Sequence, residues 1–213
     1  MEIFILVLSF VLLLAIGVPV GWSIGLSSLL TMLVSIPSIA AMTTVAQRMA
    51  TGLDSFALLA IPFFVLAGQI MNRGGIAQRL VNFARTLVGA LPGGLAHVNI
   101  IAAMLFGAIA GSAAAAASAI GSFMTKAMDD EGYSKEFAAA VNITASTTGL
   151  IIPPSNILIV YSLASGGVSI GALFLAGYLP GILTGLFLMT VGAVWAKREG
   201  FPVGEKSSIK EVA

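Results

Sequence analysis

The residues best suited to binding chemistry surround two adjacent prolines in residues 149–162, which read GLIIPPSNILIVYS. Hydroxyl and amide side chains flank the prolines, whereas residues 137–196 contain no charged residue. Neutral oxygens suit a weakly held hard cation such as Na⁺ better than a transition metal. The segment therefore predicts a cation site without charged ligands, with candidate side chains at Asn142, Thr144, Ser146, Thr147, Thr148, Ser155 and Asn156.

The prolines also predict how such a site is built, because proline cannot continue a helical hydrogen-bond ladder. We expect residues 134–149 to form one half-helix, whose carbonyl end near Thr148 and Gly149 carries the negative end of the dipole. A second half-helix would start at Ser155 or Asn156, either of which can cap its positive N–H end. The break could then hold a cation and an anion. The alternative is that Pro153 and Pro154 only kink a continuous helix.

A second candidate element is the stretch GAIAGSAAAAASAIGS at 107–122, inside the apolar run 95–125. The run could be one long helix, two full crossings, or two half-depth helices that meet near Gly111 and Ser112. Gly107 and Gly111 also form a G-x-x-x-G, which packs helices closely without any binding site. A half-depth hairpin would instead place Gly111, Ser112 and Ala113 beside the break, as in secondary transporters.

Other side chains give weaker indications of chemistry. His97 has no partner acid in its apolar run, so a packed or interfacial histidine is expected rather than a ligand. Ser112 or Ser122 with His97 would lack an acid to orient the base, so we expect no catalytic residues and no enzyme. The chain contains no cysteine, which removes disulfides and thiolate metal sites.

The composition indicates whether these elements fold in water or in a membrane. Apolar residues make up 58% of the 213 residues and charged residues 9%, with a mean hydropathy of +1.05. Soluble domains carry about a quarter charged residues. The long uncharged stretches have room for several crossings of about 20 residues each. The chain is thus expected to be a multi-pass membrane protein, with uncharged runs at 3–47, 55–72, 86–125 (except His97) and 137–196.

Sequence patterns also predict the elements that precede these two stretches. Glycine and proline between 17 and 21 predict two helices at 3–17 and 20–36, with one kinked helix as the alternative. Residues 37–53 are mixed in polarity and predict an interfacial segment. A helix is expected from Asp54 to about Asn72 with a kink at Pro62. Residues 76–90 predict an amphipathic helix in the interface plane, whose apolar side would carry Ile76, Leu80, Phe83 and Leu87.

The distribution of basic residues predicts the orientation, since Lys and Arg accumulate in cytoplasmic loops. This positive-inside rule is satisfied if residues 95–125 enter and leave the membrane from one side, residues 134–164 cross outward and residues 168–196 cross back. The N-terminus would then lie outside and the C-terminus in the cytoplasm, with Arg48 as the one exception. The residues assigned to the cytoplasm are Arg73, Arg79, Arg85, Lys126, Lys135, Lys197, Arg198, Lys206 and Lys210.

Four segments together resemble a known family. They are DSFALLAIPFFVLAGQIM (54–71), the glycine and alanine stretch 107–122, GYSKEFAAAVNITASTTGLIIPPSNILIVY (132–161) and GALFLAGYLPGILTGL (171–186). In this order they are similar to the N-terminal half of the large membrane (M) subunit of tripartite ATP-independent periplasmic (TRAP) transporters.

The resemblance implies Na⁺-coupled import of an organic acid anion across the bacterial inner membrane by an elevator-type movement. The anion would be a C4-dicarboxylate, sialic acid or similar carboxylate, and Na⁺ the coupling ion, with no other cofactor. The implied partners are a periplasmic substrate-binding (P) protein and a small membrane (Q) subunit. The implied Na⁺ ligands are Gly111, Ser112, Ala113, Thr148, Gly149, Ile152, Pro153 and Ser155, and the implied substrate residues are Ser112, Ser155 and Asn156.

The expected fold is an all-α polytopic membrane protein with an ion-transporter-like fold, forming one repeat of an inverted-repeat pair. Family members are about twice this length, so the second repeat would lie in the same or another chain. Two other functions stay open, a channel or pore-lining subunit and a structural scaffold. The expected parts are scaffold and interfacial arm helices (1–90), transport-domain elements (91–165, with a re-entrant hairpin at 95–125 and a broken helix at 134–164), a transmembrane helix (166–197) and a cytoplasmic tail or inter-repeat linker (198–213).

Overall fold

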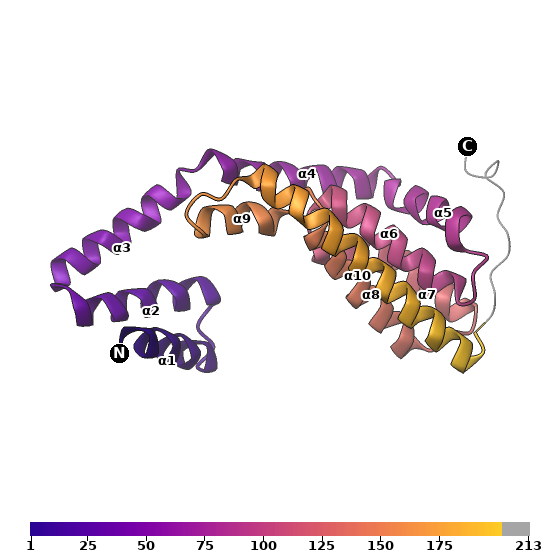
Figure 1. Ribbon diagram of the computed structural model, residues 1–213, viewed down its shortest axis with the longest axis horizontal. Coiled ribbons are helices and arrows are strands. Elements are labelled where there is room, and N and C mark those ends of the chain that lie inside the picture. The colour runs from indigo at the N-terminus through magenta and orange to yellow at the C-terminus, as the bar shows by residue number, and fades with distance from the viewer. Residues whose placement is uncertain (202–213) are drawn as a thin grey trace. The chain divides into compact units, whose positions relative to one another are not determined.

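The computed structural model describes residues 1–201, and every regular element in that range is a helix. This confirms the all-α fold class. Residues 202–213, most of the expected tail, lie outside the described part. The elements are α1 (Glu2–Ala15), α2 (Val20–Ser35), α3 (Ser38–Leu53), the 3₁₀ turn η1 (Phe56–Leu59), α4 (Ala60–Arg73), α5 (Ile76–Val88), α6 (Gly94–Ala110), α7 (Ala113–Asp130), α8 (Lys135–Ile151), α9 (Asn156–Ala164) and α10 (Ile170–Glu199) (Figure 1).

The described residues divide into two compact units, 1–56 and 57–201. In the first unit, α1 and α2 pack against each other as two separate helices, as predicted. The chain reverses at Gly17, which has a φ of +89°, and Pro19 immediately precedes α2. The Ser35 hydroxyl donates to Oε1 of Glu2 at 2.6 Å, so the end of α2 lies beside the start of α1.

The second unit begins differently from the expectation. The helix predicted from Asp54 starts as the 3₁₀ turn η1 and becomes α-helical only at Ala60. Pro62 consequently lies in the first turn of α4, where its missing N–H removes no intrahelical hydrogen bond. It lies where the 3₁₀ turn passes into α4, and the predicted kink at Pro62 stays a prediction.

The core of the second unit is built from α5, α6, α7 and α8, and its buried residues are mostly small. The packed face of α5 consists of Ala77, Val81 and Ala84, whereas Phe83 and Leu87 are 44% and 58% exposed. The expected apolar side of this helix is thus not its packed side. In a membrane, lipid accepts the large side chains and small residues let helices approach closely.

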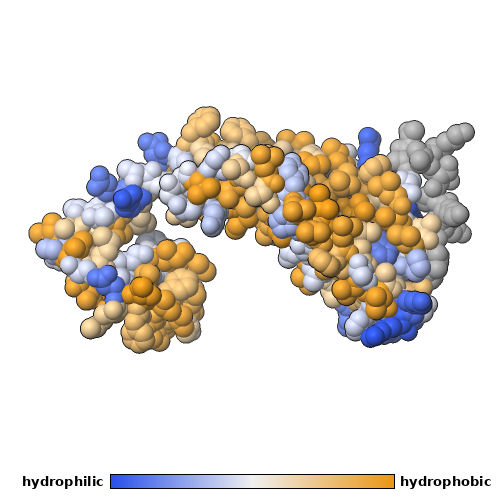
Figure 2. Space-filling view, viewed as in Figure 1, coloured by the Kyte–Doolittle hydropathy of each residue, from blue (hydrophilic) through white to orange (hydrophobic). Residues whose placement is uncertain are grey.

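Two single helices are long and apolar enough to cross a membrane among the described residues, 56–73 and α10. The pair α8 and α9 passes the same test only as a bent span, with 51° between its parts. Figure 2 shows apolar atoms over most of the visible face of α4, α9 and α10, and hydrophilic atoms gathered where α10 ends. These features fit a multi-pass membrane protein.

One end of the second unit collects several chain segments, and we call it the basal end. Gly93, just before α6, lies against Ala196 near the end of α10. The Tyr133 ring, between α7 and α8, stacks on Phe201 at 4.5 Å between centroids. Lys135 lies 4.0 Å from Asp129 in an exposed ion pair. The start of α6, the end of α7, the start of α8 and the end of α10 therefore meet at this end.

The contacts also bear on how the chain is divided into parts. Helices α4 and α5 pack with the helices that follow them and belong to the second unit. The division at residue 90 into scaffold and transport parts, and the interfacial position of α5, stay predictions.

Candidate functional site

The break between α8 and α9 lies at residues 152–155, where the sequence predicted it. Ser155 caps α9, because its hydroxyl oxygen accepts from the Leu158 N–H at 3.4 Å. The same hydroxyl donates to the Leu150 carbonyl oxygen, and the residue is fully buried. One serine thus satisfies backbone groups on both sides of the break, which confirms the predicted cap and excludes a merely kinked continuous helix.

The run 95–125 is interrupted at Gly111 and Ser112, so it is not one long helix. Gly111 ends α6 with a φ of +61°, a conformation that favours glycine. Ser112 then begins α7, and its side chain accepts from the Ala115 N–H at 3.3 Å. Helices α6 and α7 pack against each other and form a helical hairpin whose tip is Gly111 and Ser112.

The hairpin tip meets the break directly. A Cβ atom placed on Gly111 would lie 3.2 Å from the Pro154 carbonyl oxygen and 3.3 Å from Oδ1 of Asn156. That Oδ1 atom is buried and has no hydrogen-bond partner among the described residues. The structure therefore brings two predicted site residues, Gly111 and Asn156, together. Pro154, which was not a predicted site residue, joins them through its carbonyl oxygen.

Farther from the tip, the backbones of α6 and α8 touch at one pair of glycines. A Cβ on Gly107 would overlap the Cα of Gly149, and the reverse holds for Gly149. Gly107 thus serves close helix packing, and the same stretch also forms a helical hairpin. The neighbouring Thr148 is fully buried, and its hydroxyl donates to the Ala145 carbonyl at 2.6 Å.

Helix α10 covers the other side of the break through glycines that the sequence analysis missed. A Cβ on Gly177 would reach 3.3 Å from Cδ1 of Leu158 and 3.5 Å from Cδ of Pro153. A Cβ on Gly181 would overlap the Ile152 side chain. Their spacing of four residues, continued at Gly185, is the sequence signal that could have revealed this face.

The other predicted site residues lie around this contact without a common centre. Ile152 and Pro153 face α10, and Gly149 packs on Gly107. Ser112 and Ala113 are partly exposed, and Ser112 lines a cavity of about 240 Å³ on the α4 side of the hairpin. These positions leave the proposed Na⁺ ligand set a prediction.

The contacts with α10 give the position of the site along that helix. Ala196 lies at the basal end, and the break lies against Gly181 and Gly177. Fifteen to nineteen residues at about 1.5 Å each put the break about 25 Å from the basal end, and α10 continues about 10 Å beyond it. The hairpin tip therefore ends part of the way along α10.

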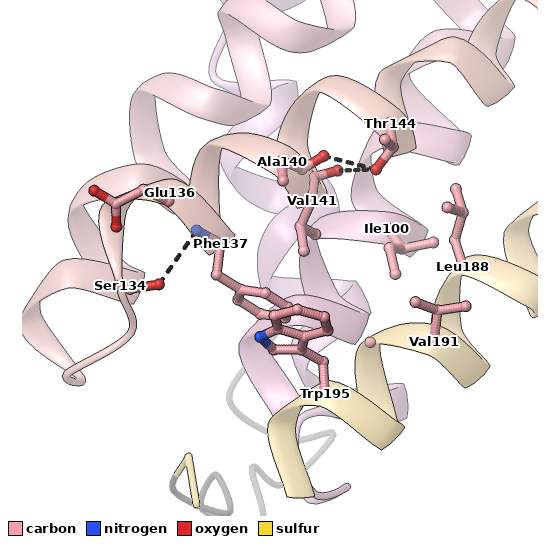
Figure 3. A pocket seen from close by; sticks show the side chains of 11 residues that line it. Ile100, Ser134, Glu136, Phe137, Ala140, Val141, Thr144, Leu188, Val191 and Trp195 are labelled. Atoms are coloured by element: carbon pink, nitrogen blue, oxygen red, sulfur yellow. Dashed lines mark hydrogen bonds between the residues drawn. The ribbon is translucent and has the colours of Figure 1, made fainter. Parts of the chain in front are cut away.

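The structure offers little support for catalysis among the described residues. His97 is 2% exposed and its Nε2 lies 3.1 Å from the Pro92 carbonyl oxygen, so it is a packed histidine. No group of three His, Asp or Glu side chains is arranged for a metal in residues 1–201. A groove of about 420 Å³ between α8 and α10 is mainly apolar, with Phe137, Val191 and Trp195 on its walls, and Thr144 is the one predicted site residue among those that line it (Figure 3).

Comparison with known proteins supports the resemblance. Residues 7–213 match the family model described as "Tripartite ATP-independent periplasmic transporter, DctM component". The chain is 59% identical over 203 residues to the uncharacterized protein YgiK of Salmonella typhimurium, covering 95% of this chain and 47% of that protein. It is 43% identical to the C4-dicarboxylate TRAP transporter large permease protein DctM of Vibrio cholerae (98% and 46% covered). It is 38% identical to the sialic acid TRAP transporter permease protein SiaT of Haemophilus influenzae (99% and 34% covered).

The match covers nearly all of this chain but half or less of each relative, because the chain spans about half the length of the curated relatives it matches. The family model, the matched segments and the helical hairpin beside a broken helix agree with one another. The chain belongs to the DctM component family of the tripartite ATP-independent periplasmic transporters.

Proposed function

We propose that this chain forms one half of the membrane permease of a Na⁺-coupled transporter that imports an organic acid anion. Relatives are named for C4-dicarboxylate and sialic acid transport, and both substrates are carboxylates. The other half of the permease, in the same or another chain, would supply the second repeat. A small Q subunit and a periplasmic binding protein would complete the transporter in the bacterial inner membrane.

The observation that carries the proposal is the meeting of the hairpin tip with the broken helix. The Pro154 carbonyl and the unpartnered Oδ1 of Asn156 both lie beside Gly111. Oxygen atoms of this kind are ligands for a hard cation. Two discontinuous elements that meet inside the membrane are typical of secondary-transport sites.

The proposed Na⁺ site therefore lies between the tip and the break, with Asn156 shared by ion and substrate. The residues proposed for Na⁺ from the sequence are Gly111, Ser112, Ala113, Thr148, Gly149, Ile152, Pro153 and Ser155, and the unpartnered Oδ1 atom of Asn156 is the reason for adding this residue to them. The residues proposed for substrate are Ser112, Ser155 and Asn156.

The proposed topology places the basal end in the cytoplasm. That end carries Lys135, and Lys197 and Arg198 lie in the last turn of α10, which agrees with the positive-inside rule. The hairpin would then enter and leave from the cytoplasmic side, with the N-terminus outside. In the elevator movement, the hairpin and broken helix would carry ion and substrate past the scaffold helices.

The experiment is Na⁺-dependent thermal stabilisation of the full-length permease with its partner subunits, comparing NaCl with choline chloride at equal ionic strength. Binding to the folded state alone raises its stability by about 2.7 kcal/mol at a hundredfold excess over Kd. We expect an upward shift of a few degrees that Asn156→Leu abolishes.

The matched control is Asn142→Leu. Its amide donates to the Ala117 carbonyl at 3.0 Å and joins α8 to α7 away from the tip. We expect this variant to be less stable but to keep the Na⁺ shift. No cation-specific shift in the native protein, or an equal loss of the shift in both variants, would overturn the proposed site.

A further inference from the structure

Two cavities follow one another along one side of α7. The first, of about 240 Å³, lies between α4 and the first half of α7 and includes Ser112 at the hairpin tip. The second, of about 300 Å³, lies between α5 and the second half of α7 and includes Asp130 at its end. Together they follow α7 over its whole length.

The walls of both cavities include polar side chains, among apolar neighbours in the first cavity and predominantly in the second. Gln69 and Asn72 of α4 and Ser118 of α7 line the first cavity, and Asn82 of α5 and Ser122 of α7 line the second. All five side chains are exposed. We call these five residues the polar lane. Amides and hydroxyls exposed to hydrocarbon are costly, so this arrangement favours contact with water.

The charges lie at the basal half of the lane. Arg85 and Lys126 line the second cavity together with Asp130, which leaves one positive charge in excess. Neither basic side chain makes an ion pair within the described residues. A positively charged mouth raises the local concentration of anions.

We infer that the polar lane is a water-filled route by which an anion moves between the hairpin tip and the basal side. The route is about 27 Å long, from the 18 residues of α7 at about 1.5 Å each. Ser112 connects it to the proposed binding site, because it belongs both to the tip and to the first cavity. The inference rests on the proposed transport function and adds the path and its charge selection.

Substituted-cysteine labelling tests the route directly, because the 213 residues contain no cysteine. Ser118→Cys and Ser122→Cys are introduced into the full-length permease, after any cysteines elsewhere in it are replaced by serine. Inside-out vesicles are treated with two membrane-impermeant thiol reagents of opposite charge, sulfonatoethyl and trimethylammonioethyl methanethiosulfonate.

The matched control is Ile143→Cys. Ile143 is 64% exposed on α8, and the neighbouring Asn142 bonds to the Ala117 carbonyl, so it lies level with Ser118. Equal expression of the variants is checked by immunoblot. We expect both lane cysteines to react from the cytoplasmic side and the control cysteine to stay unlabelled. Unreactive lane cysteines, or equal labelling of all three positions, would overturn the route.

The ratio of the two labelling rates tests the charge selection. Removing one unit charge about 10 Å away in a water-like dielectric changes the ratio of anionic to cationic rates about fourfold. We therefore expect Lys126→Gln to lower this ratio about fourfold at the Ser122→Cys position. An unchanged ratio would contradict the assignment of an anion path.

Labelling requires neither Na⁺ nor transported substrate, so its result can be read apart from the thermal-shift experiment. A Na⁺ shift without lane labelling would reject the route and keep the proposed site. Lane labelling without a Na⁺ shift would reject the ion site and keep a water-filled route.

Discussion

The backbone contact between Gly107 and Gly149 gives the sharpest test of how the hairpin is positioned. Gly107→Ala places a methyl group on the Gly149 Cα, at a distance that Cβ atoms in real structures essentially never show. Backbone cannot turn aside as a flexible side chain can, so α6 and α8 must separate by roughly 1 Å. Such a gap forfeits a quarter to a half of the dispersion energy of each contact along the pair.

The expected cost is about 1–3 kcal/mol, the usual range for overpacking a tight core. At about 2–4 °C per kcal/mol, unfolding should occur several degrees lower. The measurement is the thermal unfolding midpoint of the full-length protein in nanodiscs, followed by tryptophan fluorescence. Since one separation relieves both clashes, Gly107→Ala with Gly149→Ala should cost less than the sum of the single changes.

Gly192→Ala is the matched control, because it is also a glycine within a helix of the same unit. A Cβ there would meet Ala96 at 3.8 Å and Ile100 at 3.9 Å, which are ordinary contacts. Alanine is favoured over glycine inside helices by about 1 kcal/mol, so this variant should be as stable as the native protein or more stable. If Gly107→Ala unfolds at the same temperature as Gly192→Ala, the close contact does not position the hairpin.

Two further changes test the break and the basal end. Ser155→Ala removes the cap of α9 and the partner of the Leu150 carbonyl in a buried site, so the first turn of α9 should exchange amide hydrogens faster and the free energy of unfolding should fall by about 1–2 kcal/mol. The control is Ser169→Ala at an exposed cap, which should cost less because water can replace the lost hydroxyl. Equal losses of stability in the two variants would refute the reasoning. Gly93→Ala should lower the unfolding midpoint because its Cβ overlaps that of Ala196 and its φ is +71°. Ala196→Gly itself costs about 1 kcal/mol inside α10, but it relieves the overlap, so Gly93→Ala should cost less in that background than in the native protein, with the backbone cost of about 1–2 kcal/mol remaining. An equal cost of Gly93→Ala in the two backgrounds would contradict this account.

Much of the local structure could be predicted because the signals are local. Proline cannot continue a helix, and serine caps one, so the break and the start of α9 are encoded by Pro153, Pro154 and Ser155. The interruption at Gly111 was one of several alternatives. The sequence could not choose among them, because glycine serves a left-handed helix end and a close helix contact equally well.

The pairing of helices could not be predicted, because small residues carry no information about their partners. Gly107 packs on Gly149, and Gly181 packs on Ile152, yet each glycine alone fits any neighbouring helix. The face of α5 that packs on the protein, Ala77, Val81 and Ala84, was not predicted for a related reason. Amphipathic periodicity finds the boundary between apolar and polar surface, whereas burial in a membrane protein separates small residues from large ones.

At the hairpin tip, consecutive residues face different surroundings. Gly111 approaches the carbonyl and amide oxygens at the break, whereas Ser112 lines the first cavity on the α4 side. The Ser112 hydroxyl already accepts a hydrogen bond from the first turn of α7, so a ligand that also binds this hydroxyl would bear on how α7 starts. An ion held at Gly111 and an anion in the polar lane would therefore act on the same turn. In the proposed transporter this shared turn provides a physical route for coupling, because either ligand changes the free energy of the conformation that the other binds.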